Sequence, residues 1–488
     1  MFLWKSTFCI FFFHLASTQW SNYSFPKDFI FGITTSAYQI EGAWSEGGKG
    51  LSIWDYDLHQ NSSLVVDKTN GDIACNSYHR WKEDVELLKH LGVNFYRFSI
   101  SWTRILPLGG KDTKINDEGV KYYNELIDNL LAEEILPYIT IYHWDLPQVL
   151  QDKGGWLNET LIEDYVFYAR TLFQLFGDRV KHWITFNEFF QFCEVGYSDG
   201  QRAPFVSSPG VGGYQCSHNA LLAHGRAYRM YEKEFKSIQG GNVGVTVDGS
   251  WCDPLTPTSE SDQGAAEQFT QFNYGWFTYP ILLGNYPPIM IDRIYVLSKQ
   301  QGYESSRLPA FTSEEIKMIK GSYDFLGLNY YSTYLCTFSD NFSQPSFESD
   351  CGVLSSQPES WEPSAADWIK YSPWGLRELL VWIKEHFNNP PVLITENGWA
   401  YNSLDLDDTE RIHYLNGCLS EVLKAIYEKE CNVIGYAPWS LLDTFEWTMG
   451  YTLKFGLVHV DFESANRTRI PKRSYNMFRN IISSRRLE

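Results

Sequence analysis

The sequence lacks the basic surface that nucleic-acid binding requires. Its 488 residues include 59 Asp and Glu against 40 Lys and Arg, so the formal net charge is −19. Because phosphate backbones bind to clustered Lys and Arg, nucleic acid is not expected as a partner. The same acidity disfavours an anionic substrate, unless a local cationic pocket overrides the overall field.

Cysteine patterns typical of metal sites are also missing. The nine cysteines are scattered, and no two have the Cys-x-x-Cys spacing of zinc sites. We therefore expect no metal. In an oxidising compartment some cysteines could pair, and Cys336 with Cys351 could close a small loop. We expect most of the others to be buried free thiols, and the sequence does not fix their connectivity.

No boundary between domains is visible. The chain contains no Pro- or Ser-rich linker, no long run of charge and no short-period repeat. An α/β barrel can hold this many residues in one domain, because its insertions lie in loops. We therefore predict a single domain over residues 21–488. The oligomeric state is not indicated.

Long apolar runs are confined to the first 20 residues. One Lys, an apolar run over residues 8–13 and small residues just before position 18 predict a secretory signal peptide that ends near residue 20. No later stretch is long enough to span a bilayer, so no membrane anchor is expected. A secreted or lumenal glycoprotein is predicted. The sequons that agree with this route are Asn22, Asn61, Asn158, Asn341 and Asn466.

Two short apolar segments each end at a glutamate. Residues 182–188 read HWITFNE, and residues 392–398 read VLITENG. Each run predicts a buried strand, and the polar residue at its end lies where a parallel sheet opens to solvent. If both strands belong to one barrel, Glu188 and Glu396 emerge at the same face. Cleavage of a glycosidic bond requires two such facing carboxyl groups.

Eight strand-like runs alternate with segments of helical periodicity, which predicts a (β/α)₈ TIM barrel. The runs are residues 29–35, 95–99, 137–142, 182–186, 243–247, 325–328, 392–395 and 433–438. Two connections, residues 248–323 and 330–371, are much longer than the rest. Long insertions after barrel strands usually build the walls of the active site.

Hydrogen-bonding side chains follow seven of these eight runs. A single polar residue at a strand end is more often a satisfied core or loop residue. Their concentration at one rim indicates a site. These residues are Gln39, Arg97, His143, Trp144, Asn187, Glu188, Asn329, Tyr331, Glu396 and Trp439.

Several longer motifs occur in a fixed order along the chain. They are residues 25–32 (FPKDFIFG), 37–42 (AYQIEG), 96–102 (YRFSISW), 142–147 (YHWDLP), 185–188 (TFNE), 394–398 (ITENG) and 439–443 (WSLLD). With these motifs the chain resembles the β-glucosidase family of retaining glycoside hydrolases, family 1, over almost its whole mature length. Among its members it is most similar in character to secreted insect ones.

The resemblance implies a role for each matching residue. Glu188 corresponds to the acid/base and Glu396 to the nucleophile, with Arg97 and Tyr331 placed to keep Glu396 ionised. The residues implied to bind substrate are Gln39, His143, Asn187, Tyr331, Trp439, Glu446, Trp447 and Phe455, with Trp368 on the aglycone side. Retaining chemistry needs two carboxyl groups ~5–5.5 Å apart and no cofactor or metal. A tryptophan that packs against a helix remains the alternative for Trp368.

The implied function is a retaining β-glucosidase that acts on terminal β-D-glucosyl residues of small O-glucosides or short β-oligosaccharides. Three alternatives remain open. A glycosidase-like binding protein is disfavoured because Glu188 and Glu396 are both present. A myrosinase-like thioglucosidase is disfavoured because Glu194 and Tyr334 stand where the insect enzymes carry basic residues near the aglycone sulfate. A transglucosidase uses the same intermediate, so the sequence does not separate it from a hydrolase.

One departure from the family pattern lies beside the acid/base. The family usually has proline after this glutamate, whereas this chain has Phe189 followed by Phe190. Proline fixes φ and lacks an N–H, so we expect a looser turn around Glu188. We also expect the bulkier Phe189 to narrow the aglycone side.

Overall fold

The computed structural model describes residues 20–111, 113–339 and 344–487. Almost all of the predicted signal peptide and the sequon at Asn341 lie outside the described residues. Among the described residues, no helix has the length and apolar character needed to cross a membrane.

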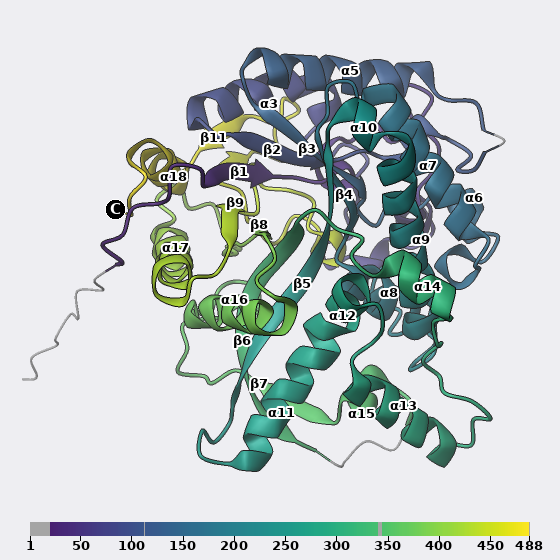
Figure 1. Ribbon diagram of the computed structural model, residues 1–488. Helices are drawn as coiled ribbons and strands as arrows, with labels where there is room; N and C mark the ends of the chain where they lie inside the picture. Colours follow the sequence, from purple (N-terminus) through teal and green to yellow (C-terminus); the bar gives the residue numbers. More distant parts are fainter. Residues whose placement is uncertain (1–19, 112, 340–343, 488) are drawn as a thin grey trace, which may run out of the picture.

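Eight parallel strands close into a barrel, as the sequence predicted (Figure 1). The hydrogen-bonded order is β5-β4-β3-β2-β1-β9-β8-β6, and β6 pairs with β5 to complete the ring. The strands are β1 (Ile30–Thr34), β2 (Phe95–Ser99), β3 (Leu136–Tyr142), β4 (His182–Asn187), β5 (Asn242–Pro254), β6 (Leu326–Phe338), β8 (Val392–Glu396) and β9 (Val433–Tyr436). Barrel strands are buried on both faces, which is why their sequences are nearly continuous apolar runs.

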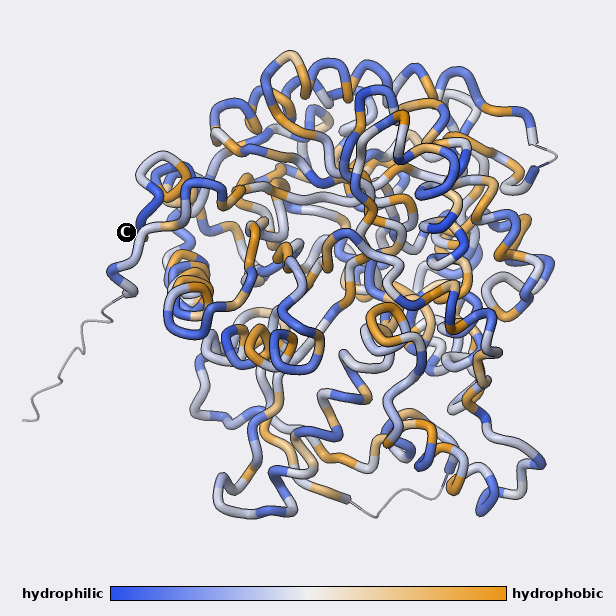
Figure 2. Tube along the Cα trace, in the orientation of Figure 1, coloured by the Kyte–Doolittle hydropathy of each residue, from blue (hydrophilic) through white to orange (hydrophobic). Residues whose placement is uncertain are grey.

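Helices surround this ring on its outer side (Figure 1). In α5 the buried residues recur at helical spacing, from Tyr122 and Tyr123 to Leu126, Ile127 and Leu130. The tube coloured by hydropathy shows hydrophilic segments along the outer turns of this helix (Figure 2). The long helices around the barrel are α3 (Ser77–Leu91), α5 (Asp117–Ala132), α7 (Leu161–Phe176), α8 (Phe189–Tyr197), α9 (Gly212–Glu234), α16 (Trp374–Phe387), α17 (Thr409–Lys429) and α18 (Arg473–Ser484).

Strands β5 and β6 are longer than predicted. From the sequence we predicted that they end just before the polar residues Asp248 and Asn329, where the barrel itself ends. Both strands nevertheless continue as a parallel pair beyond the barrel, from Val245 opposite Leu326 to Pro254 opposite Cys336. The antiparallel strand β7 (Val353–Ser356) joins the free edge of β6.

The two long connections form an extension of the barrel. Their elements include α11 (Glu260–Thr270), α12 (Trp276–Leu283), α13 (Pro288–Gln300), α14 (Ser313–Ile319) and α15 (Phe347–Cys351). In Figure 1, α11, α13, α15 and β7 lie together at the bottom of the view, where β7 pairs with the last residues of β6. A buried ion pair joins the two insertions: Arg307 binds Asp350 with two hydrogen bonds of 2.6 and 2.5 Å.

The predicted pairing of Cys336 with Cys351 is wrong. Cys336 on β6 forms a disulfide with Cys252 on β5, and the two Cα atoms lie 5.9 Å apart. Adjacent strands bring these residues together although 84 positions separate them in sequence. Cys351 stays free and buried at the end of α15. The expectation that most cysteines are buried free thiols is wrong, because four of the eight described cysteines form two disulfides and only the other four are free and buried.

We predict that Arg307→Ala lowers the free energy of unfolding by about 3–5 kcal/mol, because it leaves the Asp350 carboxylate buried and uncompensated. Unfolding in urea, followed by tryptophan fluorescence, measures the loss. Lys317→Ala, which breaks the exposed Lys317–Glu314 pair, serves as the control and should change stability by less than about 1 kcal/mol. Equal effects of the two substitutions would contradict the structural role of the buried pair.

Candidate active site

A pocket of about 450 Å³ opens at the carboxyl ends of the barrel strands. Arg97 and Asn187 are not part of its lining, but they hydrogen-bond to Glu396 and Glu188, which are. All the other substrate-contacting residues predicted from the sequence line it. They are Gln39, His143, Glu188, Tyr331, Trp368, Glu396, Trp439, Glu446, Trp447 and Phe455. The barrel topology thus brings residues from every part of the chain to one cavity.

Glu396 is the last residue of β8 and is bound on both carboxylate oxygens. Arg97 donates to Oε1 at 2.6 Å, and the Tyr331 hydroxyl donates to Oε2 at 2.9 Å. Burial raises the pKa of Glu396 above its ordinary value, while the charge of Arg97 and these two hydrogen bonds oppose the rise. The arrangement favours the ionised form of a carboxyl group that burial alone would neutralise.

Arg97 is fully buried and connects several strands. Besides Glu396, its guanidinium donates to Asn187 at 2.6 Å, to Thr140 at 3.1 Å and to Thr34 at 3.2 Å. These partners belong to β4, β3 and β1, while Arg97 itself belongs to β2. One side chain therefore fixes the relative positions of Glu396 and Asn187.

Glu188 lies directly after β4 in a different environment. Asn329 donates to its Oε1 at 2.8 Å and Asn187 to its Oε2 at 3.2 Å. Both donors are neutral amides. Burial raises the pKa of Glu188 well above its ordinary value, and the nearby Glu396 and Asp248 carboxylates raise it further. The site therefore holds one carboxyl group beside a cation and a second one without a bound cation.

The turn at Glu188 is left-handed, with φ of 52°, and α8 begins at the next residue. The expectation that Phe189 narrows the pocket is wrong. Phe189 is fully buried and packs on Phe186 and Phe277, with ring centroids 5.0 and 5.3 Å apart. Phe190, one position along the helix, is the residue that lines the pocket.

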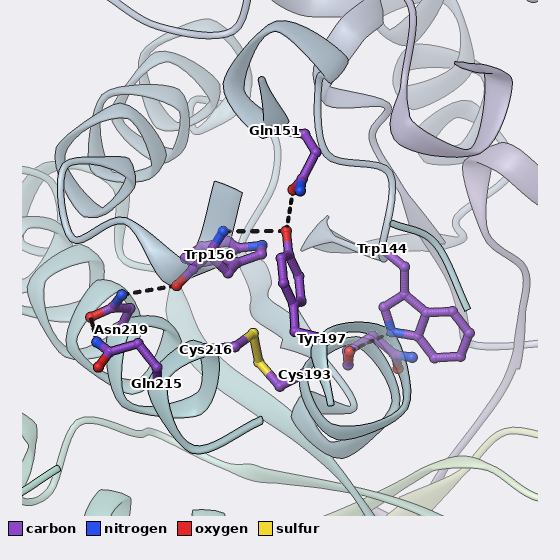
Figure 3. The surroundings of a disulfide bond; sticks show 9 residues. Trp144, Gln151, Trp156, Cys193, Tyr197, Gln215, Cys216 and Asn219 are labelled. Carbon is purple, nitrogen blue, oxygen red and sulfur yellow. Dashed lines mark hydrogen bonds between the residues drawn. A yellow bond between two sulfur atoms is a disulfide. The ribbon is translucent and has the colours of Figure 1, made fainter. Parts of the chain in front are cut away.

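A disulfide holds the helix that follows the turn. Cys193 in α8 is bonded to Cys216 in α9, with the Cα atoms 5.3 Å apart. Nearby, the Tyr197 hydroxyl lies between Gln151 and the backbone N–H of Trp156 (Figure 3). These contacts hold α8 at Cys193, one helical turn after Phe189, the position where the family usually has proline. The turn that we expected to be loose is therefore restrained on its C-terminal side.

The residues implied to bind the sugar form one connected group. Gln39 donates to Glu446 at 3.3 Å, and burial raises the pKa of Glu446 to about 7. His143 accepts a hydrogen bond from Asn187 at Nε2, 3.1 Å away. Burial, followed by the charge of Arg97, holds the pKa of His143 well below its ordinary value, so the ring is neutral. Its ring lies nearly parallel to that of Trp447, 6.0 Å away.

Trp368 lies at the mouth of the pocket with 44% of its surface exposed. It precedes α16 and contacts Tyr331 edge-on, with ring centroids 5.3 Å apart. The alternative of a helix-packing tryptophan is therefore wrong. Of the two positions considered for sulfate recognition, Tyr334 lines the pocket, whereas Glu194 is buried outside its lining.

Sequence reasoning did not name four charged residues of the pocket, Asp199, Arg202, Asp248 and Glu348. Asp248 directly follows the predicted strand 243–247, and this strand-end position was a usable signal. Arg202 lies in the irregular segment between α8 and α9. No periodicity marks it, and only the folded loop reveals its place.

The chain matches the family model described as Glycosyl hydrolase family 1 over residues 21–487. It is 48% identical to Myrosinase 1 of Brevicoryne brassicae, across 95% of this chain and 99% of that protein. It is 42% identical to the human cytosolic beta-glucosidase, across 95% and 99% respectively. Its structure superposes on that of an aphid myrosinase with a TM-score of 0.92, covering 94% of this chain and 99% of that one.

We predict that Cys193→Ser/Cys216→Ser lowers the free energy of unfolding by about 3 kcal/mol, because it opens a loop of 23 residues. It should also reduce kcat, since α8 begins directly after Glu188. Urea unfolding and initial rates measure the two effects. In the comparison variant Cys252→Ser/Cys336→Ser, stability should fall while kcat changes less. An unchanged kcat in the first variant would contradict the coupling of this disulfide to Glu188.

Proposed function

The chain belongs to glycosyl hydrolase family 1, and we propose that it is a retaining β-glucosidase that hydrolyses terminal β-D-glucosyl residues of small O-glucosides. One observation carries the proposal. Glu188 and Glu396 line the same pocket. Burial raises the pKa of both, but the Arg97 charge opposes the rise at Glu396, whereas the Glu396 and Asp248 carboxylates raise the pKa of Glu188 further. Such a difference assigns the acid and the nucleophile of a carboxyl pair.

In the first step Glu396 attacks the anomeric carbon while Glu188 protonates the leaving oxygen. Arg97 and Tyr331 hold the Glu396 carboxylate in place and ionised until it attacks. Asn187 is placed for the 2-hydroxyl, a contact that strengthens in the oxocarbenium-like transition state. The products of this step are the free aglycone and a glucosyl ester of Glu396.

In the second step Glu188 acts as a base instead of an acid. Esterification removes the negative charge of Glu396, and that charge is one of the causes that raise the pKa of Glu188. Glu188 therefore stays deprotonated more readily and accepts a proton from water. The water oxygen bonds to the anomeric carbon, while the ester bond to Glu396 breaks and releases its carboxylate. Two successive displacements retain the β-configuration.

Glucose recognition rests on the connected group around Glu446. Its carboxyl and the Gln39 amide are placed to bind the hydroxyl groups farthest from the scissile bond, with Trp439 as the platform for the ring. A carboxylate at position 446 would repel a 6-phosphate. We therefore propose an unphosphorylated glucoside. Trp368 is placed to stack on the aglycone.

A thioglucoside is the second candidate substrate, because the relative from Brevicoryne brassicae is a myrosinase. The charges of the pocket favour an O-glucoside. Six of its described lining residues carry carboxyl groups, and Arg202 is the one Lys or Arg among them. An anionic aglycone therefore finds one cation in the pocket and is repelled by each of these carboxyl groups that is ionised. The carboxyl residues are Glu188, Asp199, Asp248, Glu348, Glu396 and Glu446.

We also propose that the protein is secreted. The two disulfides support this, because such bonds persist in oxidising compartments. The apolar N-terminal segment and the sequons support the same route.

We predict that wild-type protein hydrolyses p-nitrophenyl β-D-glucoside and that Glu396→Gly loses ~10⁴-fold or more of this activity. Azide should fill the space left by the carboxylate and give α-glucosyl azide from an activated glucoside. The matched variant Glu188→Gly should give β-glucosyl azide, because there the azide attacks the glucosyl ester of Glu396. Identification of the azide anomers by NMR checks both roles, and the same anomer from both variants would refute them.

We predict a bell-shaped pH dependence of kcat/KM with an optimum below pH 7. Activity falls as pH drops through the pKa of Glu396, which must be ionised. It falls again as pH rises through the raised pKa of Glu188, which must be protonated. With 2,4-dinitrophenyl β-D-glucoside, whose leaving group needs no acid, Glu188→Gln should keep the acidic limb and lose the alkaline one. An alkaline limb that survives in Glu188→Gln would assign it to another group.

A further inference from the structure

Strand β8 contains one additional residue directly before Glu396. Leu328 of β6 lies opposite Ile394, and the next residue, Asn329, lies opposite Glu396, so Thr395 is an extra residue between two paired ones. An extra residue of this kind is a β-bulge, which changes the direction of a side chain and is common beside active sites. Thr395 is fully buried. The bulge allows two consecutive side chains, those of Thr395 and Glu396, to reach groups at the carboxyl end of the barrel.

The Thr395 hydroxyl forms two contacts with neighbouring strands. It donates to Oδ1 of Asn329 on β6 at 2.7 Å, and its oxygen lies 3.3 Å from the hydroxyl oxygen of Thr246 on β5. A hydroxyl group has a single proton, and that of Thr395 is used on Asn329. Thr246 is therefore the donor in the second contact. A directed chain of hydrogen bonds runs from Thr246 through Thr395 to Asn329.

The Asn329 amide satisfies its neighbours in one orientation. Arg97 can only donate, so its 2.6 Å contact requires the side-chain oxygen of Asn187 as the acceptor. The same oxygen accepts from Nδ2 of Asn329 at 3.1 Å, and Nδ2 also donates to Oε1 of Glu188 at 2.8 Å. The nitrogen of Asn329 thus faces two acceptors, while its oxygen faces the Thr395 hydroxyl.

These hydrogen bonds close into a ring at the base of Glu188. The backbone N–H of Glu188 donates to the carbonyl oxygen of Thr246 at 3.0 Å, so Thr246 contacts both ends of the chain. The packing around Thr246 is tight: a Cβ atom at Gly327 would lie 2.3 Å from the Thr246 hydroxyl oxygen. The ring therefore has little freedom to rearrange.

We infer that Thr395 is a positioning residue for the acid/base: by orienting the Asn329 amide, it keeps a hydrogen-bond donor on Glu188 while this carboxyl group is ionised. A hydrogen bond to the ionised form stabilises that form. The ionised form of Glu188 acts in the second step, where it accepts a proton from water. The inference rests on the proposed β-glucosidase function and adds a residue that lies behind the lining of the pocket.

The charges around Glu188 explain why this donor matters. Burial raises the pKa of Glu188 most, and the Glu396 and Asp248 carboxylates raise it further, whereas the hydrogen bond from Asn329 lowers it. Esterification removes the charge of Glu396 but leaves the effect of burial. The donor therefore still favours the ionised base in the glucosyl-enzyme. The charged and titratable groups that face Glu188 are Glu396, Asp248, Arg202 and Tyr331.

The first test separates the two steps with 2,4-dinitrophenyl β-D-glucoside. Its leaving group needs no acid, so kcat/KM reports the first step, and kcat is expected to report the second. Thr395→Val keeps the shape of the side chain but removes the donor to Asn329. It should lower kcat by roughly 10-fold and KM by the same factor, leaving kcat/KM unchanged. Thr395→Ser retains the hydroxyl and should restore kcat.

Thr185→Val is the matched control. Thr185 is also fully buried on a barrel strand, and its hydroxyl lies 2.7 Å from Nδ1 of His224. This variant loses a buried hydroxyl of the same size without touching Asn329, so kcat and KM should stay at wild-type values. Thr395→Ala removes the same donor as Thr395→Val and should give the same result, so that a failure of one variant to fold leaves the other as the test.

The second test uses the pH dependence. Glu188 is protonated in the first step, so its pKa sets the alkaline limb of kcat/KM for p-nitrophenyl β-D-glucoside. Loss of the donor raises this pKa, and the alkaline limb of Thr395→Val should move up by about one pH unit. In the second step Glu188 is ionised, so the acidic limb of kcat on 2,4-dinitrophenyl β-D-glucoside should also move to higher pH. Thr185→Val should shift neither limb.

The third test replaces water by azide, which needs no base. An azide nitrogen bonds to the anomeric carbon while the ester bond to Glu396 breaks and releases its carboxylate, and no proton is transferred. Azide should therefore raise kcat of Thr395→Val on 2,4-dinitrophenyl β-D-glucoside toward the wild-type value and give β-glucosyl azide. It should leave kcat of Thr185→Val unchanged.

The outcomes distinguish the inference from the function on which it rests. Equal losses of kcat and kcat/KM in Thr395→Val, with unshifted pH limbs, would indicate a general disturbance of the barrel and overturn the inference. Thr395→Ser that behaves like Thr395→Val would overturn it as well, because the hydroxyl would then be irrelevant. In both cases the β-glucosidase function would stand. If the wild type hydrolysed no glucoside at all, the proposed function would fail and the inference with it.

Discussion

The buried ion pair between Arg97 and Glu396 is the interaction on which the rest of the structure depends. A guanidinium in the centre of a barrel is tolerated only if its donors are satisfied and its charge is balanced. Removal of either partner would leave the other as an unpaired buried charge. Arg97 meets this requirement with groups from β1, β3, β4 and β8. The same bonds that satisfy it align Glu396 and, through Asn187, Glu188. One buried side chain thus links four barrel strands and aligns the two carboxyl groups.

Much of this arrangement could be predicted from the sequence because it follows from local patterns. Buried parallel strands read as apolar runs, and a glutamate at the end of such a run must face the open end of the barrel. Glu188 and Glu396 were found in this way. The extension of β5 and β6 was missed because its strands are half-exposed beyond Asp248 and Asn329 and lose the apolar signal. The partner of Cys336 was missed because sequence proximity favoured Cys351, whereas strand pairing decides which sulfur atoms meet.

The two halves of the pocket differ in how far they could be foreseen. Glu188, Glu396, His143 and Asn329 project from strand ends or directly after them, so their positions are set by the barrel. Arg202 instead comes from an irregular segment, and Phe190 belongs to α8, whose direction depends on the turn at Glu188. Loop conformation, not strand register, places these groups. Groups positioned by the barrel and groups positioned by loops can therefore change independently within one fold.

The disulfide between Cys193 and Cys216 gives this site a property that a proline could not. A proline restrains the backbone in every environment, whereas a covalent bond between two sulfur atoms exists only where oxidation has occurred. Chains made in a reducing cytosol would build the same barrel around Arg97 but leave the helix after Glu188 without its covalent link to α9. Whether the turn at Glu188 carries this restraint therefore depends on the redox history of each molecule.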